Sequence, residues 1–275
     1  MPATQQFYRS AELPWLEIRH SANSASCFDP HTHSTHSIGC LLEGQSYFHY
    51  RDQKRTCSTQ QLCLINADEV HACRPDTEQG WRYLMLYIEP QWLTGLFNEG
   101  AEPGNQPLRF KQPQLTSPSL SQQFIQNCIQ LTQLGGLIQQ EQLATLLSTL
   151  CQQDSRAPDR PQTLHRPALQ RTAEYIRAHY QQSLSLTELA HISGLSPSHL
   201  QRSFRQHFGV SPAHFQHQCR INDACQRLRQ QQPISEVAAA TGYADQSHLY
   251  RWFRRFIDTT PRQYSKARPL SLKLT

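Results

Sequence analysis

The sequence lacks the features of membrane and secreted proteins. No stretch approaches the roughly 18 consecutive apolar residues of a membrane span, and the start, MPATQQFYRS, has no basic segment followed by an apolar run. The nine cysteines are an odd count and include no CxxC pair, so a disulfide framework is not predicted. We therefore expect a cytoplasmic protein whose cysteines are reduced and mostly buried, with a redox or metal sensor as the alternative.

Charge is unevenly distributed along the chain. Residues 1–164 carry 11 Lys and Arg against 15 Asp and Glu, a net charge of −4, whereas residues 165–275 carry 15 against 6, a net charge of +9. In the basic part only Lys266 and Lys273 are lysines. The other basic residues are arginines, whose planar fork fits phosphate and guanine. This asymmetry predicts two domains, with nucleic acid as the partner of the C-terminal one.

The basic part contains one pattern twice. The first copy reads LTELAHISGLSPSHLQRSFRQHFGVSPAHF from residue 186, and the second reads ISEVAAATGYADQSHLYRWFRRFIDTTPRQY from residue 234. Gly194 and Gly242 are 48 residues apart, whereas Phe204 and Phe253 are 49 apart. A one-residue insertion therefore falls in the second turn, at 244–245. A short helix, a turn and a longer helix, repeated, predict two helix-turn-helix units.

Residues that cap helices set the expected helix bounds. Ser185 and Glu188 fit a capping box, and Ser196, Ser211 and Thr260 each precede a proline at a first helical position. Seven helices are expected in this all-α domain, at about 169–180, 186–192, 197–207, 212–230, 234–240, 246–256 and 261–267. The long fourth helix would join the two units.

The second helix of a helix-turn-helix enters the major groove, so its outward polar side chains are candidate base readers. Gln pairs with adenine, Arg with guanine, and Ser or His with several bases. The candidate base contacts are Ser198, Gln201, Arg202, Gln246, Ser247, His248 and Arg251. The candidate phosphate contacts, which fix register only, are Arg205, Arg220, Arg254 and Arg255. The alternative to DNA binding is that these residues form only a solvent-exposed basic face. The duplication of the pattern favours DNA binding over this alternative.

The N-terminal part has a different period. Between residues 15 and 88, short strand-forming runs alternate with turn residues, which predicts an all-β sandwich or small barrel with room for one small molecule. The expected strands are 37–42, 46–50, 61–65, 70–73 and 81–88.

Residues after this barrel return to helical spacing. A loop with one short extended piece at 108–110 precedes a helical hairpin at about 117–152, whose apolar faces cover the barrel, pair with a second subunit, or do both. Residues 152–167 have linker composition. The domains are therefore expected at 1–160 and 165–268.

Both parts resemble one known family. The run PISEVAAATGYADQSHLYRWFRRFIDTTPRQY, within about 165–267, resembles the signature of the AraC/XylS family of bacterial transcription regulators. The N-terminal part is similar to the cupin-like sensing domain of that family, through HTH at 31–33, the glycine of EG at 43–44, LCLINADEVHAC and WRYLMLYI. The resemblance implies two units that read successive major grooves, and it places base contacts at the seven readers named above. Ser198 departs from the family because it is small.

Cupin enzymes hold a metal with an H-x-H pair, a carboxylate and a later histidine. By this resemblance His31, His33 and His71 are metal-ligand candidates, but Ser37 and Ile38 stand where the carboxylate would follow. Three interpretations stay open for the cluster: an effector pocket, a metal-sensing site, or structural histidines. The candidate effector-binding residues are His31, His33, Tyr47, His49, His71, Trp81 and Tyr83.

The combined expectation is a transcription regulator without enzymatic activity or a cofactor. A small effector in the barrel would change which half-sites on promoter DNA a homodimer spans. Activation, with RNA polymerase as a further partner, is expected from the family. The alternatives are a metal- or redox-responsive regulator that uses the His/Cys cluster, and a cupin enzyme with a DNA-binding tail.

Overall fold

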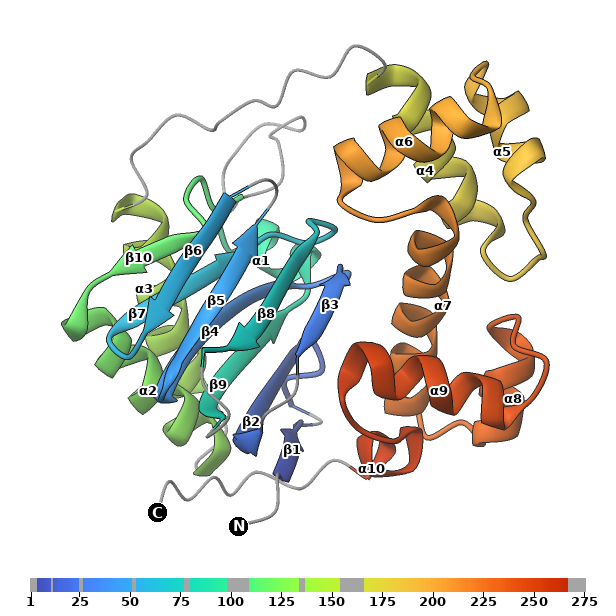
Figure 1. Cartoon of the computed structure of the whole chain (residues 1–275). Helices are drawn as coiled ribbons and strands as arrows, with labels where there is room; N and C mark the ends of the chain where they lie inside the picture. Colours follow the sequence, from blue (N-terminus) through green and yellow to red (C-terminus); the bar gives the residue numbers. More distant parts are fainter. Residues whose placement is uncertain are drawn as a thin grey trace.

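Two domains lie side by side in the computed structural model, which describes residues 4–10, 12–24, 27–50, 53–76, 80–97, 109–133, 137–153 and 166–266 (Figure 1). Within these residues, the N-terminal domain consists of two β-sheets and three helices, and the C-terminal domain is helical. This confirms the expected fold class. No described helix has the length and apolar character needed to cross a membrane.

The two sheets of the N-terminal domain are antiparallel. One has the strand order β1-β2-β9-β4-β7-β10, and the other has the order β3-β8-β5-β6. The strands are β1 (Thr4–Tyr8), β2 (Leu16–Ser24), β3 (Phe28–His31), β4 (His36–Glu43), β5 (Gln45–Tyr50), β6 (Gln53–Ser58), β7 (Gln61–Ile65), β8 (His71–Pro75), β9 (Trp81–Ile88) and β10 (Gln114–Thr116).

The five expected strands are present as β4, β5, β7, β8 and β9. Strands β1, β2, β3 and β6 were not predicted, because polar residues interrupt their apolar alternation. In β2, for example, Glu17, Arg19 and His20 are all buried. The short extended piece expected at 108–110 is wrong at Arg109 and Phe110, since the strand lies at β10 instead, and residue 108 is outside the described residues.

A helical hairpin covers the six-stranded sheet. It consists of α2 (Pro118–Gln133) and α3 (Leu137–Gln153), and the short α1 (Pro90–Phe97) precedes it. Phe124 and Leu147 share one core with Ile38, Leu64 and Leu86 of the sheet. The expected covering of the barrel is confirmed, while pairing with a second subunit stays a prediction. Residues 154–165 lie outside the described residues, so the boundary near residue 160 also stays a prediction.

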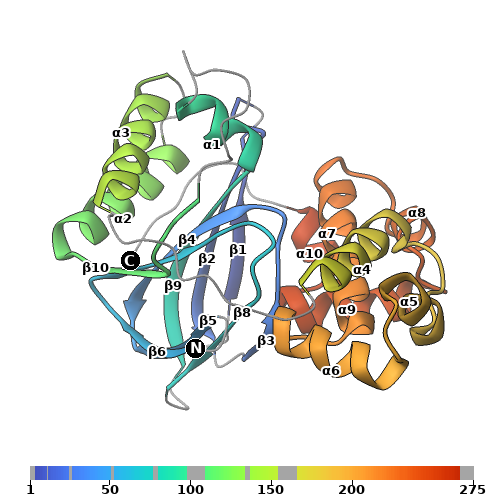
Figure 2. The ribbon, with the colours of Figure 1, turned by 90° about the horizontal axis from the view of Figure 1, so that it is seen from above.

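The C-terminal helices lie close to their expected positions. They are α4 (Arg166–His179), α5 (Leu186–Ser193), α6 (Pro197–Phe208), α7 (Pro212–Arg229), α8 (Ile234–Ala240), α9 (Gln246–Ile257) and α10 (Pro261–Ser265). Seen from above, all of them lie to one side of the sheets (Figure 2). Helix α7 joins two separate cores, one around Leu200 and Phe204 and the other around Leu249 and Phe253.

The helix caps differ in detail from the sequence prediction. The Ser185 side chain accepts from the Glu188 amide, but the Glu188 carboxylate accepts from the Tyr175 hydroxyl, so the capping box is only half formed. The full box is at Thr260 and Gln263. Reciprocal bonds of this kind satisfy amides that the helix itself leaves free.

The two turns are also unequal. Ser196 stands at the N-cap of α6 without a side-chain cap bond, contrary to expectation, whereas Asp245 accepts from the His248 amide at the start of α9. The insertion at 244–245 therefore places Asp245, which forms a side-chain N-cap hydrogen bond, directly before the second recognition helix. Both turns use a left-handed glycine, Gly194 with φ +70° and Gly242 with φ +78°.

The domains are held together at a buried carboxylate. Glu17 of β2 is 4% exposed and its Oε2 lies 2.5 Å from Arg9 Nε and 3.3 Å from Arg229 Nε. The Tyr264 hydroxyl donates to the same oxygen over 3.1 Å. Burial acts to raise the pKa of Glu17, but the charges of Arg229 and Arg9 outweigh it and hold that pKa below its ordinary value. Phe7 packs edge-on against Tyr264 beside this network.

Further polar contacts join the N-terminal domain to the second helix-turn-helix unit. Arg255 Nη2 of α9 lies 2.7 Å from Asp29 Oδ2 of β3, and Gln5 Nε2 of β1 donates to Asp258 Oδ2 over 3.0 Å. His214 Nε2 donates to the Pro30 carbonyl over 2.8 Å. Contact with the first unit is smaller: Val70 packs against its core, close to Gly209.

Gly194→Ala and Gly242→Ala form a matched pair of tests. A Cβ at Gly194 meets nothing within 4 Å, but at Gly242 it would lie 2.2 Å from the Gln181 carbonyl oxygen. The first change costs the left-handed strain alone, about 1–2 kcal/mol. We expect a clearly larger loss of unfolding free energy for Gly242→Ala in urea denaturation. Equal losses would contradict the close packing against Gln181.

Glu17→Gln tests the buried network. It leaves Arg9 and Arg229 close together without a counter-charge, and removal of one partner of a buried pair costs about 3–5 kcal/mol. Because both arginines are partly exposed, we expect a loss at the lower end of this range, about 3 kcal/mol, in urea denaturation. Glu43→Gln, which breaks the exposed pair with Arg82, is the control and should cost less than about 1 kcal/mol. Similar losses would show that Glu17 is not a special site.

Candidate DNA interface and effector cavity

The two recognition helices, α6 and α9, expose the side chains that the sequence predicted. Leu200, Phe204, Leu249 and Phe253 are buried. The opposite faces of α6 and α9 therefore point toward solvent. Six of the predicted base readers are exposed: Ser198, Gln201, Arg202, Gln246, Ser247 and Arg251. The exposure permits contact with DNA, and the contacts themselves stay predictions.

His248 is the exception among the predicted readers. Its ring is half-buried, and its Nε2 accepts from Trp252 Nε1 over 3.2 Å. The ring also lies edge-on to Tyr243, with 5.1 Å between centroids. Residues four apart on a helix share a face, so Trp252 holds His248 against α9. This side chain is less free to turn toward a base than the other six.

One predicted phosphate contact is wrong. Arg220 of α7 is 7% exposed, and its guanidinium donates to the carbonyls of Tyr180 over 2.7 Å and of Gln182 over 2.8 Å. It therefore ties α7 to the chain after α4 and is not available to DNA. Gln216 and Ile221 are buried on the same helix, so Arg220 belongs to the inward part of α7.

The other three phosphate candidates stay on the surface. Arg205 and Arg254 are exposed in the last turns of α6 and α9. Arg255 is also exposed but forms the ion pair with Asp29 described above. In this structure the N-terminal domain thus binds one side chain that the sequence analysis assigned to DNA.

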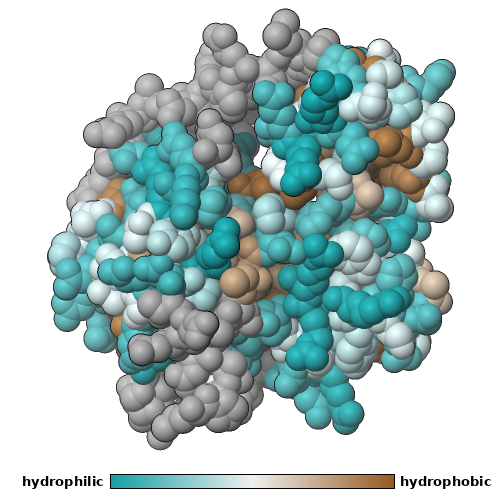
Figure 3. Space-filling view, viewed as in Figure 1, coloured by the Kyte–Doolittle hydropathy of each residue, from teal (hydrophilic) through white to brown (hydrophobic). Residues whose placement is uncertain are grey.

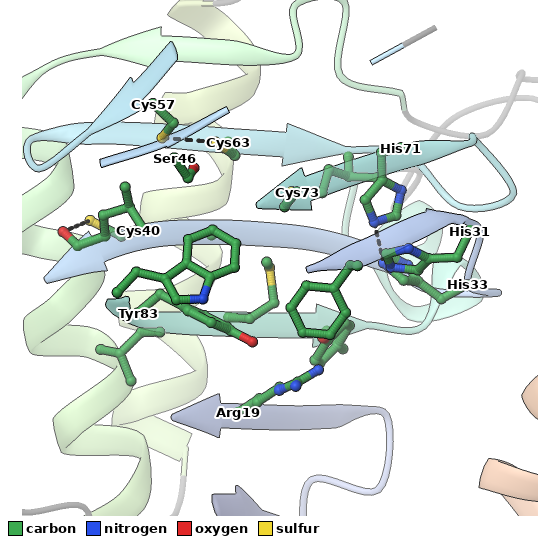
Figure 4. Close-up of a pocket in the computed structure, with 18 residues that line it drawn as sticks. Arg19, His31, His33, Cys40, Ser46, Cys57, Cys63, His71, Cys73 and Tyr83 are labelled. Atoms are coloured by element: carbon green, nitrogen blue, oxygen red, sulfur yellow. Dashed lines mark hydrogen bonds between the residues drawn. The ribbon is translucent and has the colours of Figure 1, made fainter. Parts of the chain in front are cut away.

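A cavity of about 50 Å³ lies between the two sheets of the barrel (Figure 4). Five of the predicted effector residues line it: His31, His33, His71, Trp81 and Tyr83. The remaining wall is mostly apolar and includes Phe28, Leu41, Ile65 and Met85, together with Arg19 and the cysteines Cys40, Cys57, Cys63 and Cys73.

Two predicted effector residues, Tyr47 and His49, do not line this cavity. Side chains alternate along a strand, and in β5 the buried positions are Ser46, Phe48 and Tyr50. Tyr47 therefore lies on the outer face, where Lys54 Nζ is 3.8 Å from its ring centroid. His49 lines a separate cavity of about 320 Å³. The assignment of both residues to the effector site is corrected on this ground.

The three cavity histidines share one arrangement. Each directs Nδ1 to a backbone carbonyl: His31 to Asp29 over 2.7 Å, His33 to Thr35 over 3.1 Å, and His71 to Glu69 over 3.0 Å. A carbonyl can only accept, so Nδ1 carries the proton and Nε2 keeps its lone pair. The ligand atoms of the three lie within 4.8 Å of one another.

Two of these lone pairs face each other. His33 Nε2 and His71 Nε2 are 3.1 Å apart, where neither nitrogen can donate to the other. Burial and the neighbouring imidazoles lower the pKa of His33 and of His71 to about 3. Both rings are therefore neutral near pH 7, and the contact has no proton to stabilise it.

The cysteines form a separate feature of the same wall. Cys57 Sγ and Cys63 Sγ are 3.1 Å apart at the end of the cavity away from the histidines (Figure 4). Burial raises the pKa of Cys73 and of Cys40. Among the described residues the group that could hold a metal consists of the three histidines, so Cys40 and Cys73 do not join it.

A second cavity, of about 430 Å³, lies between the domains. Arg19, His31, His33 and Tyr87 line both cavities, so the barrel and the cleft meet at these side chains. The other wall of the cleft comes from the C-terminal domain and includes Gln218, Asn222 and Arg229 of α7, and Phe256 and Ile257 of α9. In the space-filling view, a few apolar atoms appear near the middle of a largely hydrophilic face (Figure 3).

Comparison with known protein families assigns both domains. The model of an AraC-like ligand binding domain matches residues 15–151, and the model of a helix-turn-helix domain matches residues 189–267. Together the two matches cover most of the chain.

Known proteins agree with this assignment. The chain is 27% identical over 225 residues to YbfI of Bacillus subtilis, an HTH-type transcriptional regulator, with 81% of each protein covered. An HTH-type transcriptional regulator of Staphylococcus aureus is 23% identical over 241 residues. The match covers 84% of this chain but only 31% of that longer relative.

Solved structures show the same two-domain fold. The apo form of a point variant of ToxT from Vibrio cholerae superposes with a TM-score of 0.59 at 12% identity, over 94% of this chain and 98% of that one. ToxT with a bound unsaturated fatty acid gives 0.56 at 10% identity, over 99% and 100%. The chain therefore belongs to the AraC family of helix-turn-helix transcriptional regulators, with an N-terminal ligand-binding domain and a C-terminal DNA-binding domain.

Proposed function

We propose that this regulator binds a specific promoter sequence and responds to a small effector held in the barrel. The observation that carries this proposal is the placement of β3. His31 at its end lines the cavity, and Asp29, two residues earlier, pairs with Arg255 of the second recognition helix. A ligand that shifts β3 would alter both contacts at once.

The same strand contributes a further connection. The Pro30 carbonyl accepts from His214 of α7, and α7 joins the two helix-turn-helix units. An effector acts by favouring one of two arrangements, and it shifts the balance only by its difference in affinity for them. Here the two arrangements are α9 held on β3 and α9 released from it. Release makes Arg255 available to phosphate.

The remaining features of the proposal rest on the family. ToxT has been solved with an unsaturated fatty acid bound, which supports a small-molecule ligand for this fold. We propose a cytoplasmic homodimer that activates transcription together with RNA polymerase and has no catalytic activity. The exposed readers on both α6 and α9 support reading of two successive major grooves by each subunit.

Arg251→Ala and Arg254→Ala separate base reading from phosphate binding. We expect DNase footprinting on the promoter of the protein's own gene to show protection of about two helical turns per subunit. Arg251→Ala should relax specificity at one base pair by about 1–3 kcal/mol. Arg254→Ala should weaken all sequences alike and reduce the salt slope by about one. Equal effects of the two changes, or protection independent of sequence, would contradict specific reading.

A metal-responsive regulator is the second candidate. The ligand atoms of three histidines lie within 4.8 Å of one another. Their Nδ1–H groups are fixed by carbonyls, and the Nε2 lone pairs of His33 and His71 face each other. Such outer hydrogen bonds orient metal-binding histidines, so the donor set fits a divalent ion that prefers imidazole. An ion there would place a strong positive charge beside the cavity. Against this candidate, Arg19 already adds positive charge near His31 and His33, whose pKa values it lowers.

Equilibrium dialysis against Zn²⁺, Ni²⁺ and Cu²⁺ tests the metal candidate. If it holds, the wild type binds one ion per chain, and the combined variant His31→Ala, His33→Ala, His71→Ala loses it. His49→Ala, which removes a histidine outside the cavity, is the control and should keep the ion. Binding that survives the triple change would remove the metal interpretation.

A further inference from the structure

A buried arginine points to the chemistry of the effector. Arg19 of β2 is 4% exposed and lines the barrel cavity (Figure 4). Its guanidinium carbon lies 5.0 Å from the ring centroid of Phe28, 5.4 Å from that of Phe7 and 5.7 Å from that of Tyr83. The rings remove the charge from water, and the arginine stays protonated because its pKa is always far above neutral.

The hydrogen bonds of Arg19 are incomplete. Its Nε donates to Gln5 Oε1 over 2.9 Å, and the Tyr87 hydroxyl is a second polar neighbour. Within the part of the chain that the structure describes, Nη2 has no hydrogen-bond partner. A buried donor that is left unpaired costs more when it belongs to a charged group than when it belongs to a neutral one. The network lacks an acceptor at this point.

A second donor in the same wall is also unpaired. Trp81 is 6% exposed, lines the cavity, and among the described residues its Nε1 has no partner. Indole and guanidinium nitrogens donate and cannot accept. The two side chains therefore call for a ligand that accepts hydrogen bonds, and the positive charge favours a negative one.

We propose that Arg19 and Trp81 form an anion site in the barrel cavity, and that the effector is a small monocarboxylate with an apolar body. This rests on the proposed function, in which the barrel holds the effector. A carboxylate matches the planar guanidinium fork. Phe28, Leu41, Ile65 and Met85 supply apolar surface for the rest of the molecule, and the small volume, about 50 Å³, favours a short chain or a single ring.

Isothermal titration calorimetry on the full chain tests this site. The probes are monocarboxylates from acetate to octanoate, with benzoate and phenylacetate, and the corresponding neutral amides. We expect saturable binding of at least one carboxylate with one site per chain, and binding of its amide at least about tenfold weaker, the value for a charged hydrogen bond.

Variants separate ligand binding from a packing role of Arg19. Arg19→Met keeps the side-chain stem and should weaken the carboxylate at least about tenfold, whereas Arg74→Met on the exposed face of β8 should leave it unchanged. If Arg19→Met fails to fold, Trp81→Phe removes the other donor and should weaken the carboxylate severalfold while the amide is affected less.

Three results would overturn the proposal: no saturable binding of any carboxylate, equal binding of carboxylates and amides, or variants in the cavity that bind as the wild type does. Equal binding of amides would leave the barrel as an effector site and remove only its preference for an anion. Loss of sequence-specific protection in footprinting would instead remove the proposed function.

Discussion

The arrangement of the two domains depends on one carboxylate that water hardly reaches. Glu17 meets Arg9 of its own domain, and Arg229 and Tyr264 of the other. A buried charge is tolerated only where opposite charges and hydrogen bonds compensate it. Arg9, Arg229 and Tyr264 are therefore positioned around the same carboxylate. The N-terminal domain and the second helix-turn-helix unit thus share one buried polar cluster. The apolar contact of Phe7 with Tyr264 excludes water from its edge.

The docking of the domains is asymmetric. The second unit contacts the sensor through Glu17, Asp29 and Gln5, whereas the first unit contacts it near Val70. Gln5 has a special position, because its amide oxygen accepts from Arg19 in the barrel and its nitrogen donates to Asp258 at the end of α9. Asp258 is the left-handed C-cap of that helix. The cavity and the second recognition helix are thus separated by one side chain.

Much of this fold could be predicted from the sequence where one local pattern decides the structure. The seven C-terminal helices followed from caps, prolines and a repeat, and the outward faces of α6 and α9 from helical spacing. Strand β2 was missed because its buried residues include Glu17 and Arg19, whose charges are compensated by residues of other segments, among them the distant Arg229. Arg220 was misassigned for the same reason, since its carbonyl partners are about 40 residues away. The assignment of Tyr47 and His49 to the effector site was wrong because it considered residue type alone. The alternation of side chains along the strand, which was visible in the sequence, places both on the outer face.

Helix α7 has a consequence for the DNA itself. It is a continuous element of 18 residues, about 27 Å long at 1.5 Å per residue, and Arg220 anchors it to one unit while its other end lies in the core of the second. The distance between the recognition helices is therefore a property of the protein. Successive major grooves are about 34–36 Å apart along straight DNA. Where this fixed separation differs from the groove repeat, the duplex has to deform, so a sequence that bends easily between the two contacted grooves would be favoured even without a base contact there.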